Sequence, residues 1–259
     1  MNTRYGAFSA FLAIIVLMTA APVRAATLDW AGQTWTISTS RIGSGLVTGN
    51  TGTAFVDSSG YLHLDLSKIG GKWYGGEVAT VNNLGFGSYY WVFNAPLTSM
   101  EAQDVLAGFS YGPQNGLGVS SQNEIDVEFS RWNNSSWFPA GNNGDFDIYP
   151  PPPAKKGSDV EHDWNYTGGN TATCRIDWSS TSITESIWSG VAPTNASTST
   201  ANVTWTLSDT ATIPQSALPF MFNFWAFGTL PTQPVDAIVQ TFQYIPAPAP
   251  APPHQPVSP

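Results

Sequence analysis

Apolar and polar residues alternate in short runs along most of this chain, which is the pattern of β-strands. In residues 61–66 leucine occupies every second position, while His63 and Asp65 point to the other side. Further runs rich in β-branched and aromatic residues occupy 89–93, 105–111, 182–188 and 218–227. Clusters of Gly, Asn, Ser and Pro separate the runs, and no stretch after residue 25 keeps a helical period for three turns. The pattern predicts an all-β protein with the architecture of a sandwich.

The same alternation places three carboxylates side by side. Residues 123–129 read Asn-Glu-Ile-Asp-Val-Glu-Phe, and their β-branched and aromatic members favour a strand. Successive strand side chains point to opposite faces, so Glu124, Asp126 and Glu128 project from one face. Like charges so close repel each other, and the chain has only 18 Asp and Glu in 259 residues. The cluster indicates a catalytic site, with a solvated acidic strand as the alternative.

Ideal strand geometry suits the hydrolysis of glycosides. The α-carbons of Glu124 and Glu128 lie about 13 Å apart at ~3.3 Å per residue. If the two side chains lean together, their carboxyls approach to about 5 to 6 Å, near the roughly 5 to 5.5 Å of a retaining glycosidase. Crowding separates the pKa values of such groups, so that one is protonated while another is ionised. Asp126 lies between them, where it can maintain this difference.

The acid motif resembles the signature of the family 16 glycoside hydrolases, retaining β-glucanases and relatives built on a β-jelly-roll. Weaker matches occur on both sides of the acid motif, in the order that the family has them, at residues 84–90, 108–111, 176–178 and 221–225. The resemblance as a whole covers residues from about 27 to 245. The resemblance implies that Glu124 is the nucleophile and Glu128 the general acid/base, with Asp126 tuning both. It implies a jelly-roll β-sandwich of two curved antiparallel sheets with a substrate cleft. It also implies an endo-acting enzyme that cleaves β-glucan with retention of configuration.

Substrate-binding candidates come partly from this resemblance and partly from position. Asn223 and Trp225 match cleft positions of the family, with Trp225 as a stacking platform, and Glu77 matches an acid that binds sugar in lichenases. Phe109 and Tyr111 are two apart on a strand expected beside the acids, and Trp132 and Trp137 follow the acids in a loop. Each has an alternative as a core or solvated side chain. The candidates are Glu77, Phe109, Tyr111, Trp132, Asn223 and Trp225.

Details of the motif point to a branch of the family. Val127 is followed directly by Glu128, as in the lichenase and xyloglucan-active branches, which favours mixed-linkage β-1,3-1,4-glucan as substrate. Three positions depart from the lichenase pattern: Gln122 replaces a Trp, Ala79 a cleft Arg, and Gln240 an Asp that helps hold a structural calcium in some lichenases. A structural calcium is therefore not supported by the sequence, and we expect no other metal and no cofactor.

Composition narrows the partners. The net charge of −9 argues against nucleic acid and anionic membranes. Charged residues make up only 10% of the chain and Trp numbers 11, which fits a neutral polysaccharide whose sugar rings stack on aromatic side chains. The only Cys, Cys174, excludes an internal disulfide and is expected to be a buried thiol. We expect a monomer.

The chain divides into three parts. Residues 1–25 resemble a secretory signal, with Arg4 before an apolar run and a small-residue cleavage site at 23–25. Residues 26–245 are expected to form a catalytic domain like that of the family 16 glycoside hydrolases. Residues 246–259 are a Pro/Ala-rich tail, expected to be extended because proline fixes φ. The signal predicts a secreted protein, extracellular or periplasmic.

Alternatives to a β-glucan hydrolase remain open. Within the same family, a transglycosylase would pass the sugar to another sugar hydroxyl, and a laminarin- or xyloglucan-active enzyme would differ in substrate. In another class, a non-catalytic carbohydrate-binding module can use the same sandwich. The three crowded acids argue against a binding module, because binding alone does not need them.

Overall fold

The computed structural model describes residues 26–112, 123–151 and 159–248. The proposed signal segment, Gln122 and nearly all of the tail lie outside this part of the chain. Within the described residues, no helix is long and apolar enough to cross a membrane.

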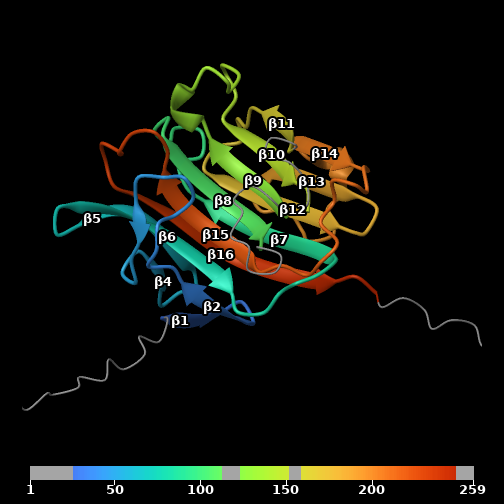
Figure 1. Ribbon diagram of the computed structural model, residues 1–259, viewed down its shortest axis with the longest axis horizontal. Coiled ribbons are helices and arrows are strands. Elements are labelled where there is room, and N and C mark those ends of the chain that lie inside the picture. Colours follow the sequence, from blue (N-terminus) through green and yellow to red (C-terminus); the bar gives the residue numbers. More distant parts are fainter. Residues whose placement is uncertain (1–25, 113–122, 152–158, 249–259) are drawn as a thin grey trace, which may run out of the picture.

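Two antiparallel layers face each other in the structure (Figure 1). The first sheet contains the strand with the three acids, β9, and is called the acidic sheet here. Its strand order is β11-β10-β9-β8-β15-β6, and it continues through β2 to β1. The second sheet has the order β14-β13-β12-β7-β16-β5, with β4 at its edge. The hairpin of β5 and β6 joins the two sheets. The strands are β1 (Thr27–Trp30), β2 (Gln33–Ile37), β3 (Thr48–Gly49), β4 (Ala54–Val56), β5 (Leu62–Ile69), β6 (Lys72–Thr80), β7 (Gly87–Asn94), β8 (Asp104–Tyr111), β9 (Glu124–Ser130), β10 (Gly144–Tyr149), β11 (Val160–Trp164), β12 (Thr171–Trp178), β13 (Ile183–Ser189), β14 (Val203–Leu207), β15 (Phe220–Ala226) and β16 (Val235–Pro246).

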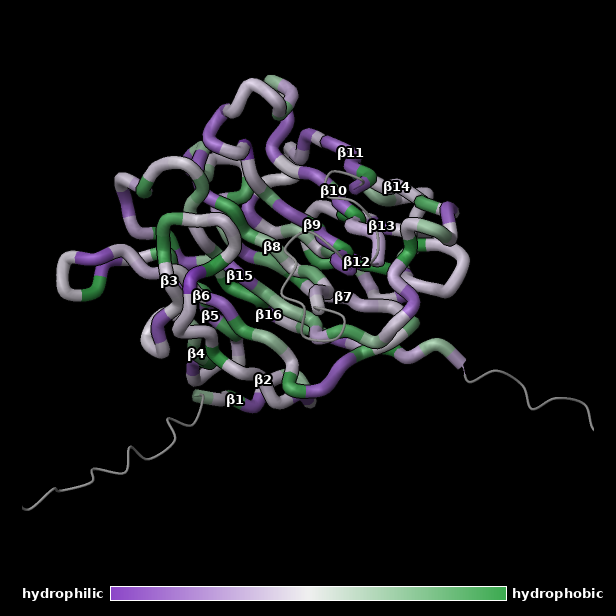
Figure 2. The backbone as a smooth tube through the Cα atoms, in the orientation of Figure 1, coloured by the Kyte–Doolittle hydropathy of each residue, from purple (hydrophilic) through white to green (hydrophobic). Residues whose placement is uncertain are grey.

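The predicted jelly-roll sandwich is confirmed. Each run assigned to a strand from its alternation coincides with one of β5, β7, β8, β9, β13 or β15. The described helical residues form only two short 3-10 turns, η2 (Trp132–Asn134) and η3 (Thr198–Thr200). Hydrophilic residues recur along β9, β10 and β11, as Figure 2 shows, because these strands carry acids on their outer face.

Aromatic rings fill the space between the sheets. Trp91 and Phe93 of β7 meet Phe220 and Phe222 of β15, with ring centroids 5.4 Å apart for Trp91–Phe220 and 5.8 Å for Phe93–Phe222. Edge-on contacts of this kind add to the free energy gained by burying the rings. The lone Cys174 of β12 is buried beside this core, as predicted, and burial raises the pKa of its thiol.

This core fixes which face of β9 meets solvent. Ile125, Val127 and Phe129 are fully buried against it. A shift of one residue in register would move these three outward and bring the acids into the core, so the apolar positions strongly specify the register. Glu124, Asp126 and Glu128 consequently lie on the outer face of the acidic sheet.

The last strand runs slightly further than the sequence indicates. β16 extends through Pro246, which lies opposite Gly87 of β7. The backbone N–H of Ala247 then donates to the carbonyl of Phe86 at 2.9 Å. Proline lacks a donor but is tolerated at a strand end, so the strand continues one residue into the segment assigned to the tail, and Ala247 adds one more hydrogen bond.

Gly108 of β8 offers a test of core packing. A Cβ at this position would lie 2.7 Å from the indole of Trp91, closer than unstrained atoms approach. We expect Gly108→Ala to lower the free energy of unfolding by about 1 to 3 kcal/mol, because overpacking forces the ring or the strand to move. Urea unfolding measures this change. Gly85→Ala is the matched control, since its Cβ would meet ordinary contacts at 3.8 Å and beyond. Equal loss in both variants would contradict this account.

Candidate active site

A cleft of about 520 Å³ lies over the acidic sheet. The structure brings all nine candidate site residues to its walls: the three acids and the six substrate-binding candidates. The residues that line it are Arg41, Gly43, Ser44, Glu77, Phe109, Tyr111, Glu124, Asp126, Glu128, Trp132, Tyr149, Met221, Asn223 and Trp225.

Strand register explains why residues so far apart in sequence meet here. Glu128 of β9 lies opposite Ala107 of β8, which lies opposite Asn223 of β15, which in turn lies opposite Glu77 of β6. One such row crosses four strands on the same face of the sheet. Ala107, whose small side chain is fully buried, separates Glu128 from Asn223 in this row.

The three acids sit in surroundings that disfavour their ionised forms. Asp126 is only 3% exposed, whereas Glu124 and Glu128 keep partial contact with solvent although each lies deep among protein atoms. Burial, then the nearby charge of Asp147, raises the pKa of Glu124 to about 8, and a hydrogen bond with Asp126 opposes this rise. Burial, followed by the charges of neighbouring acids, raises the pKa values of Asp126 and Glu128 well above their usual range.

The surroundings differ between the two outer acids in a chemically useful way. The hydrogen bond from Asp126 stabilises the carboxylate form of Glu124. The main influences on Glu128, namely burial and the charges of four carboxylates led by Asp145, all favour its protonated form. The arrangement therefore suits one ionised group that can attack and one protonated group that can donate.

A second polar pair lies across the cleft. Glu77 and Asn223 are cross-strand neighbours on β6 and β15. Burial raises the pKa of Glu77, while hydrogen bonds from Ser38 and Asn223 lower it in part. The two candidates thus hold each other in place, as expected for side chains that must keep a fixed orientation.

Aromatic residues close one end of the cleft. Trp132 contacts Trp225 and Trp137, with ring centroids 5.9 Å and 5.6 Å apart. Trp225 is only 4% exposed because the loop containing Gly43 and Gly45 covers its ring, and a Cβ at Gly45 would lie 2.3 Å from it. The sequence-based interpretation of Trp225 as an open stacking platform is therefore corrected: Trp225 lines the cleft with only a small part of its ring.

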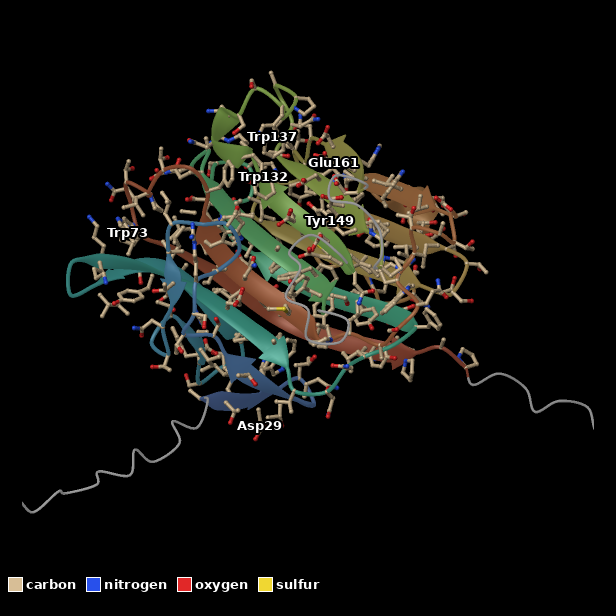
Figure 3. The ribbon with its side chains drawn as sticks, in the orientation of Figure 1. Asp29, Trp73, Trp132, Trp137, Tyr149 and Glu161 are labelled. Atoms are coloured by element: carbon tan, nitrogen blue, oxygen red, sulfur yellow. The ribbon has the colours of Figure 1, made fainter. Side chains whose placement is uncertain are left out.

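Trp137 is instead the exposed ring of this cluster, at 56%. Figure 3 shows Trp132 and Trp137 close together beyond β9. The backbone of Trp132, Asn133 and Asn134 has positive φ angles of 45°, 58° and 50°. Three consecutive residues other than glycine rarely adopt this conformation, so the loop is held in an unusual shape that presents the two indoles.

Sequence reasoning missed several lining residues. Tyr149 alternates with Asp145 and Asp147 on β10, a pattern that would have revealed it, and its hydroxyl bonds to Asp147. Arg41 had no comparable signal. It enters from the loop before β3, where its guanidinium donates to the carbonyl of Gly45 at 2.8 Å.

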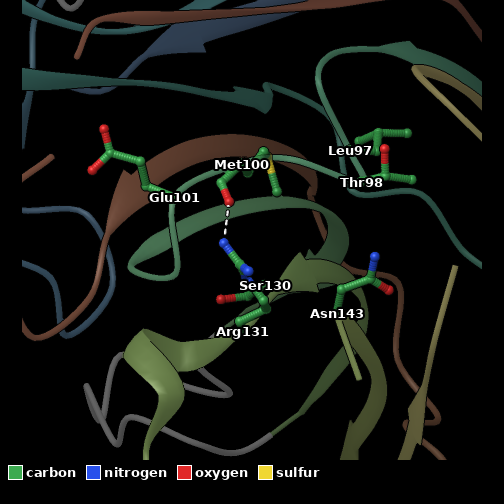
Figure 4. Close-up of a pocket in the computed structure, with 7 residues that line it drawn as sticks. All are labelled: Leu97, Thr98, Met100, Glu101, Ser130, Arg131 and Asn143. Carbon is green, nitrogen blue, oxygen red and sulfur yellow. Dashed lines mark hydrogen bonds between the residues drawn. The ribbon is translucent and has the colours of Figure 1, made fainter. Parts of the chain in front are cut away.

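Arg131, the arginine nearest to the acids in sequence, does not line the cleft. Arg131 follows β9 directly, but its guanidinium turns to a neighbouring pocket and donates to the carbonyl of Met100 (Figure 4). The acids consequently lack this nearby positive charge. Beside them, on β10 and β11, Asp145, Glu161 and Asp163 form a group of carboxylates with the spacing needed to hold a metal ion.

Comparison with known proteins identifies the fold. No family model matches the chain, and no curated protein sequence matches it. Among solved structures, a β-glucanase of Bacillus licheniformis aligns with a TM-score of 0.58 and 19% identity over 81% of this chain and 91% of that one. A family 16 enzyme of the mixed-linkage glucan locus of Bacteroides ovatus, solved with its product, has a TM-score of 0.60 and 14% identity over 82% and 94%. A lichenase from a mouse hindgut metagenome has a TM-score of 0.59 and 15% identity over 85% and 96%. The chain therefore has the jelly-roll fold of the family 16 β-glucanases.

The buried acids predict how stability depends on pH. Their pKa values are raised in the folded state, for example Glu124 to about 8 and Asp104 and Asp147 to about 7, so the native protein binds more protons than the unfolded chain. Stability should therefore fall as pH rises from about 4.5 to 8. Glu128→Gln removes one of these groups and should raise the free energy of unfolding at pH 8 by about 1 kcal/mol. Urea unfolding across this pH range, with chelator present, measures both effects.

Asp29→Asn is the control for this experiment, because Asp29 is a surface acid at the opposite side of the molecule (Figure 3). It should leave the free energy of unfolding at pH 8 close to that of the wild type, because it removes no buried acid. A Glu128→Gln variant no more stable than wild type at pH 8 would show that burial of this carboxyl costs little.

Proposed function

We propose that this protein is a retaining endo-β-glucanase whose preferred substrate is mixed-linkage β-1,3-1,4-glucan. The observation that carries the proposal is the arrangement on β9: two glutamates on one cleft-facing side, with an aspartate between them that supports the ionised form of Glu124. The fold of the β-glucanases, shared at 14–19% identity, supports the same reaction class.

The reaction proceeds in two displacements. A carboxylate oxygen of Glu124 attacks the anomeric carbon and forms a bond to it. The bond from that carbon to the glycosidic oxygen breaks, and Glu128 transfers its proton to this departing oxygen. A water molecule then attacks the anomeric carbon, gives its proton to Glu128 and releases Glu124 as a carboxylate. Two inversions give net retention.

Features of the site support a neutral glucan as substrate. β9 pairs with β8 and β10 in continuous register, so no bulge separates Val127 from Glu128. The resemblance associates this unbulged strand with lichenase-type and xyloglucan-active enzymes, and two of the similar structures are named for mixed-linkage glucan or lichenase activity. Aromatic rings at one end and hydroxyl and amide groups along the cleft suit sugar faces and sugar hydroxyls.

Two rival functions predict different products. A transglycosylase with the same acids would transfer the sugar to an added oligosaccharide in place of water. A binding module would retain polysaccharide and release no reducing ends. We further propose that the protein acts outside the cytoplasm, on the strength of the signal-like residues 1–25.

Glu124→Ala should reduce turnover of lichenan by about 10³-fold or more, since no carboxylate remains to form the covalent intermediate. Reducing-end release from lichenan, laminarin and xyloglucan measures the activity and ranks the substrates. Asp29→Ala is the control and should retain wild-type rates. Azide can replace the missing carboxylate as the nucleophile. When it is added to Glu124→Ala together with an activated glucoside, the bond to the leaving group should break again and the product should be a glycosyl azide of inverted configuration. Full activity of the variant without azide would refute the assignment.

Trp137→Ala should raise KM for long glucan chains by about 2- to 10-fold, with little change in kcat, because the exposed indole can stack on a sugar ring distant from the reacting bond. Steady-state kinetics on the polymer and on short oligosaccharides distinguishes an effect on KM from an effect on kcat, and shows whether the effect requires a long chain. Trp73→Ala is the matched control, since Trp73 packs under Lys68 on the β5–β6 hairpin away from the cleft. An unchanged KM in Trp137→Ala would remove this residue from the substrate path.

A further inference from the structure

The acidic face does not end at the three glutamate and aspartate residues of β9. Asp145 of β10 lies opposite Glu128 on one side and opposite Asp163 of β11 on the other. Asp147 likewise lies between Asp126 and Glu161. Four more carboxyl groups therefore continue the same face across two further strands, far more negative charge than a two-acid mechanism needs.

Three of these groups converge on a common point. One carboxylate oxygen from each of Asp145, Glu161 and Asp163 lies within 4.8 Å of the other two. Two oxygens that share a calcium ion at about 2.4 Å each lie no more than about 4.8 Å apart, so the spacing suits one calcium ion. Calcium also tolerates irregular oxygen coordination, whereas magnesium demands near-ideal octahedral geometry, so carboxylates contributed by two strands favour calcium.

A second observation concerns atoms without a partner. Asp145 is 2% exposed, and its Oδ1 atom is buried with no hydrogen-bond partner. Oδ1 of Asp163 is also buried and unpartnered. A buried carboxylate oxygen left unpaired is costly, so such atoms call for a ligand. None of the ion pairs between described residues involves these acids.

The remaining contacts fit a metal site with an entry path. The other oxygen of Asp145, Oδ2, accepts a hydrogen bond from the indole nitrogen of Trp132 at 3.2 Å, which orients the carboxylate. Glu161 is exposed and provides access from solvent (Figure 3). Oxygen ligands alone are the preference of hard cations such as calcium, whereas zinc favours nitrogen and sulfur.

We propose that Asp145, Glu161 and Asp163 bind a calcium ion at the end of the cleft beside Glu128. This site lies on the acidic sheet, away from Gln240, which sits at a register shift of β16 in the second sheet. The ion neutralises much of the excess charge on β10 and β11. It also fixes Asp145, and through it the ring of Trp132, which lines the cleft. The site stands independently of the proposed glucanase activity.

Terbium luminescence tests the site directly, because Tb³⁺ replaces Ca²⁺ and is sensitised by a nearby indole such as Trp132. We expect saturable emission on tryptophan excitation, displaced by Ca²⁺ with an apparent Kd of about 10⁻⁵ to 10⁻³ M. Mg²⁺ should displace it at least tenfold less well. Calorimetric titration with Ca²⁺ should give the same affinity without relying on Trp132.

Variants locate the ion. Asp163→Asn and Glu161→Gln keep side-chain shape, relieve repulsion and should each weaken Ca²⁺ binding by tenfold or more. Asp236→Asn, at the ion pair with His63 on the second sheet, and Glu124→Gln, in the neighbouring acid row, should leave the affinity unchanged. The proposal is overturned if Ca²⁺ does not bind saturably at concentrations up to about 10 mM. That limit is weaker than the dissociation constants of calcium sites in extracellular modules. It is also overturned if Glu124→Gln weakens binding as much as Asp163→Asn does.

Discussion

Carboxyl groups crowded on β9, β10 and β11 are the constraint on which the rest of this structure depends. They cannot relax by turning away, because the opposite face of β9 carries Ile125, Val127 and Phe129, fully buried in the core. A register change would expose that apolar face, at a greater cost than the repulsion it would relieve. The sandwich therefore keeps the acids together and raises their pKa values, which is the condition that acid–base chemistry requires.

Aromatic rings contact the acidic sheet on both of its faces, in the core and at one end of the cleft. Rings such as Trp91 and Phe222 hold the second sheet against the back of the acidic sheet. Trp132 links the cleft to the acids directly, since its indole bonds to Asp145 while its ring packs against Trp225. A change in the charge of β10 would consequently reach the ring that lines the substrate path.

The proposed glucanase and the proposed calcium site respond to the same excess of negative charge. Protonation reduces part of this negative charge. Burial, reinforced by a hydrogen bond with Asp163, raises the pKa of Glu161 to about 8. A divalent cation would do so without protonating every acid, which leaves Glu124 free to ionise. The two proposals remain separable, because one concerns the row on β9 and the other the hairpin of β10 and β11.

The sequence by itself determined six of the described strands, the face on which the acids stand and the all-β class, because side-chain alternation with a period of two is local information. The resemblance and the strand or loop positions together selected nine residues that the structure brings to one cleft. Tertiary structure alone decided what surrounds them. Arg41 and the glycine loop over Trp225 arrive from the chain before β3, and Asp163 reaches Asp145 only through strand pairing. Such neighbours depend on register and loop path across the whole sheet, which a local pattern does not encode.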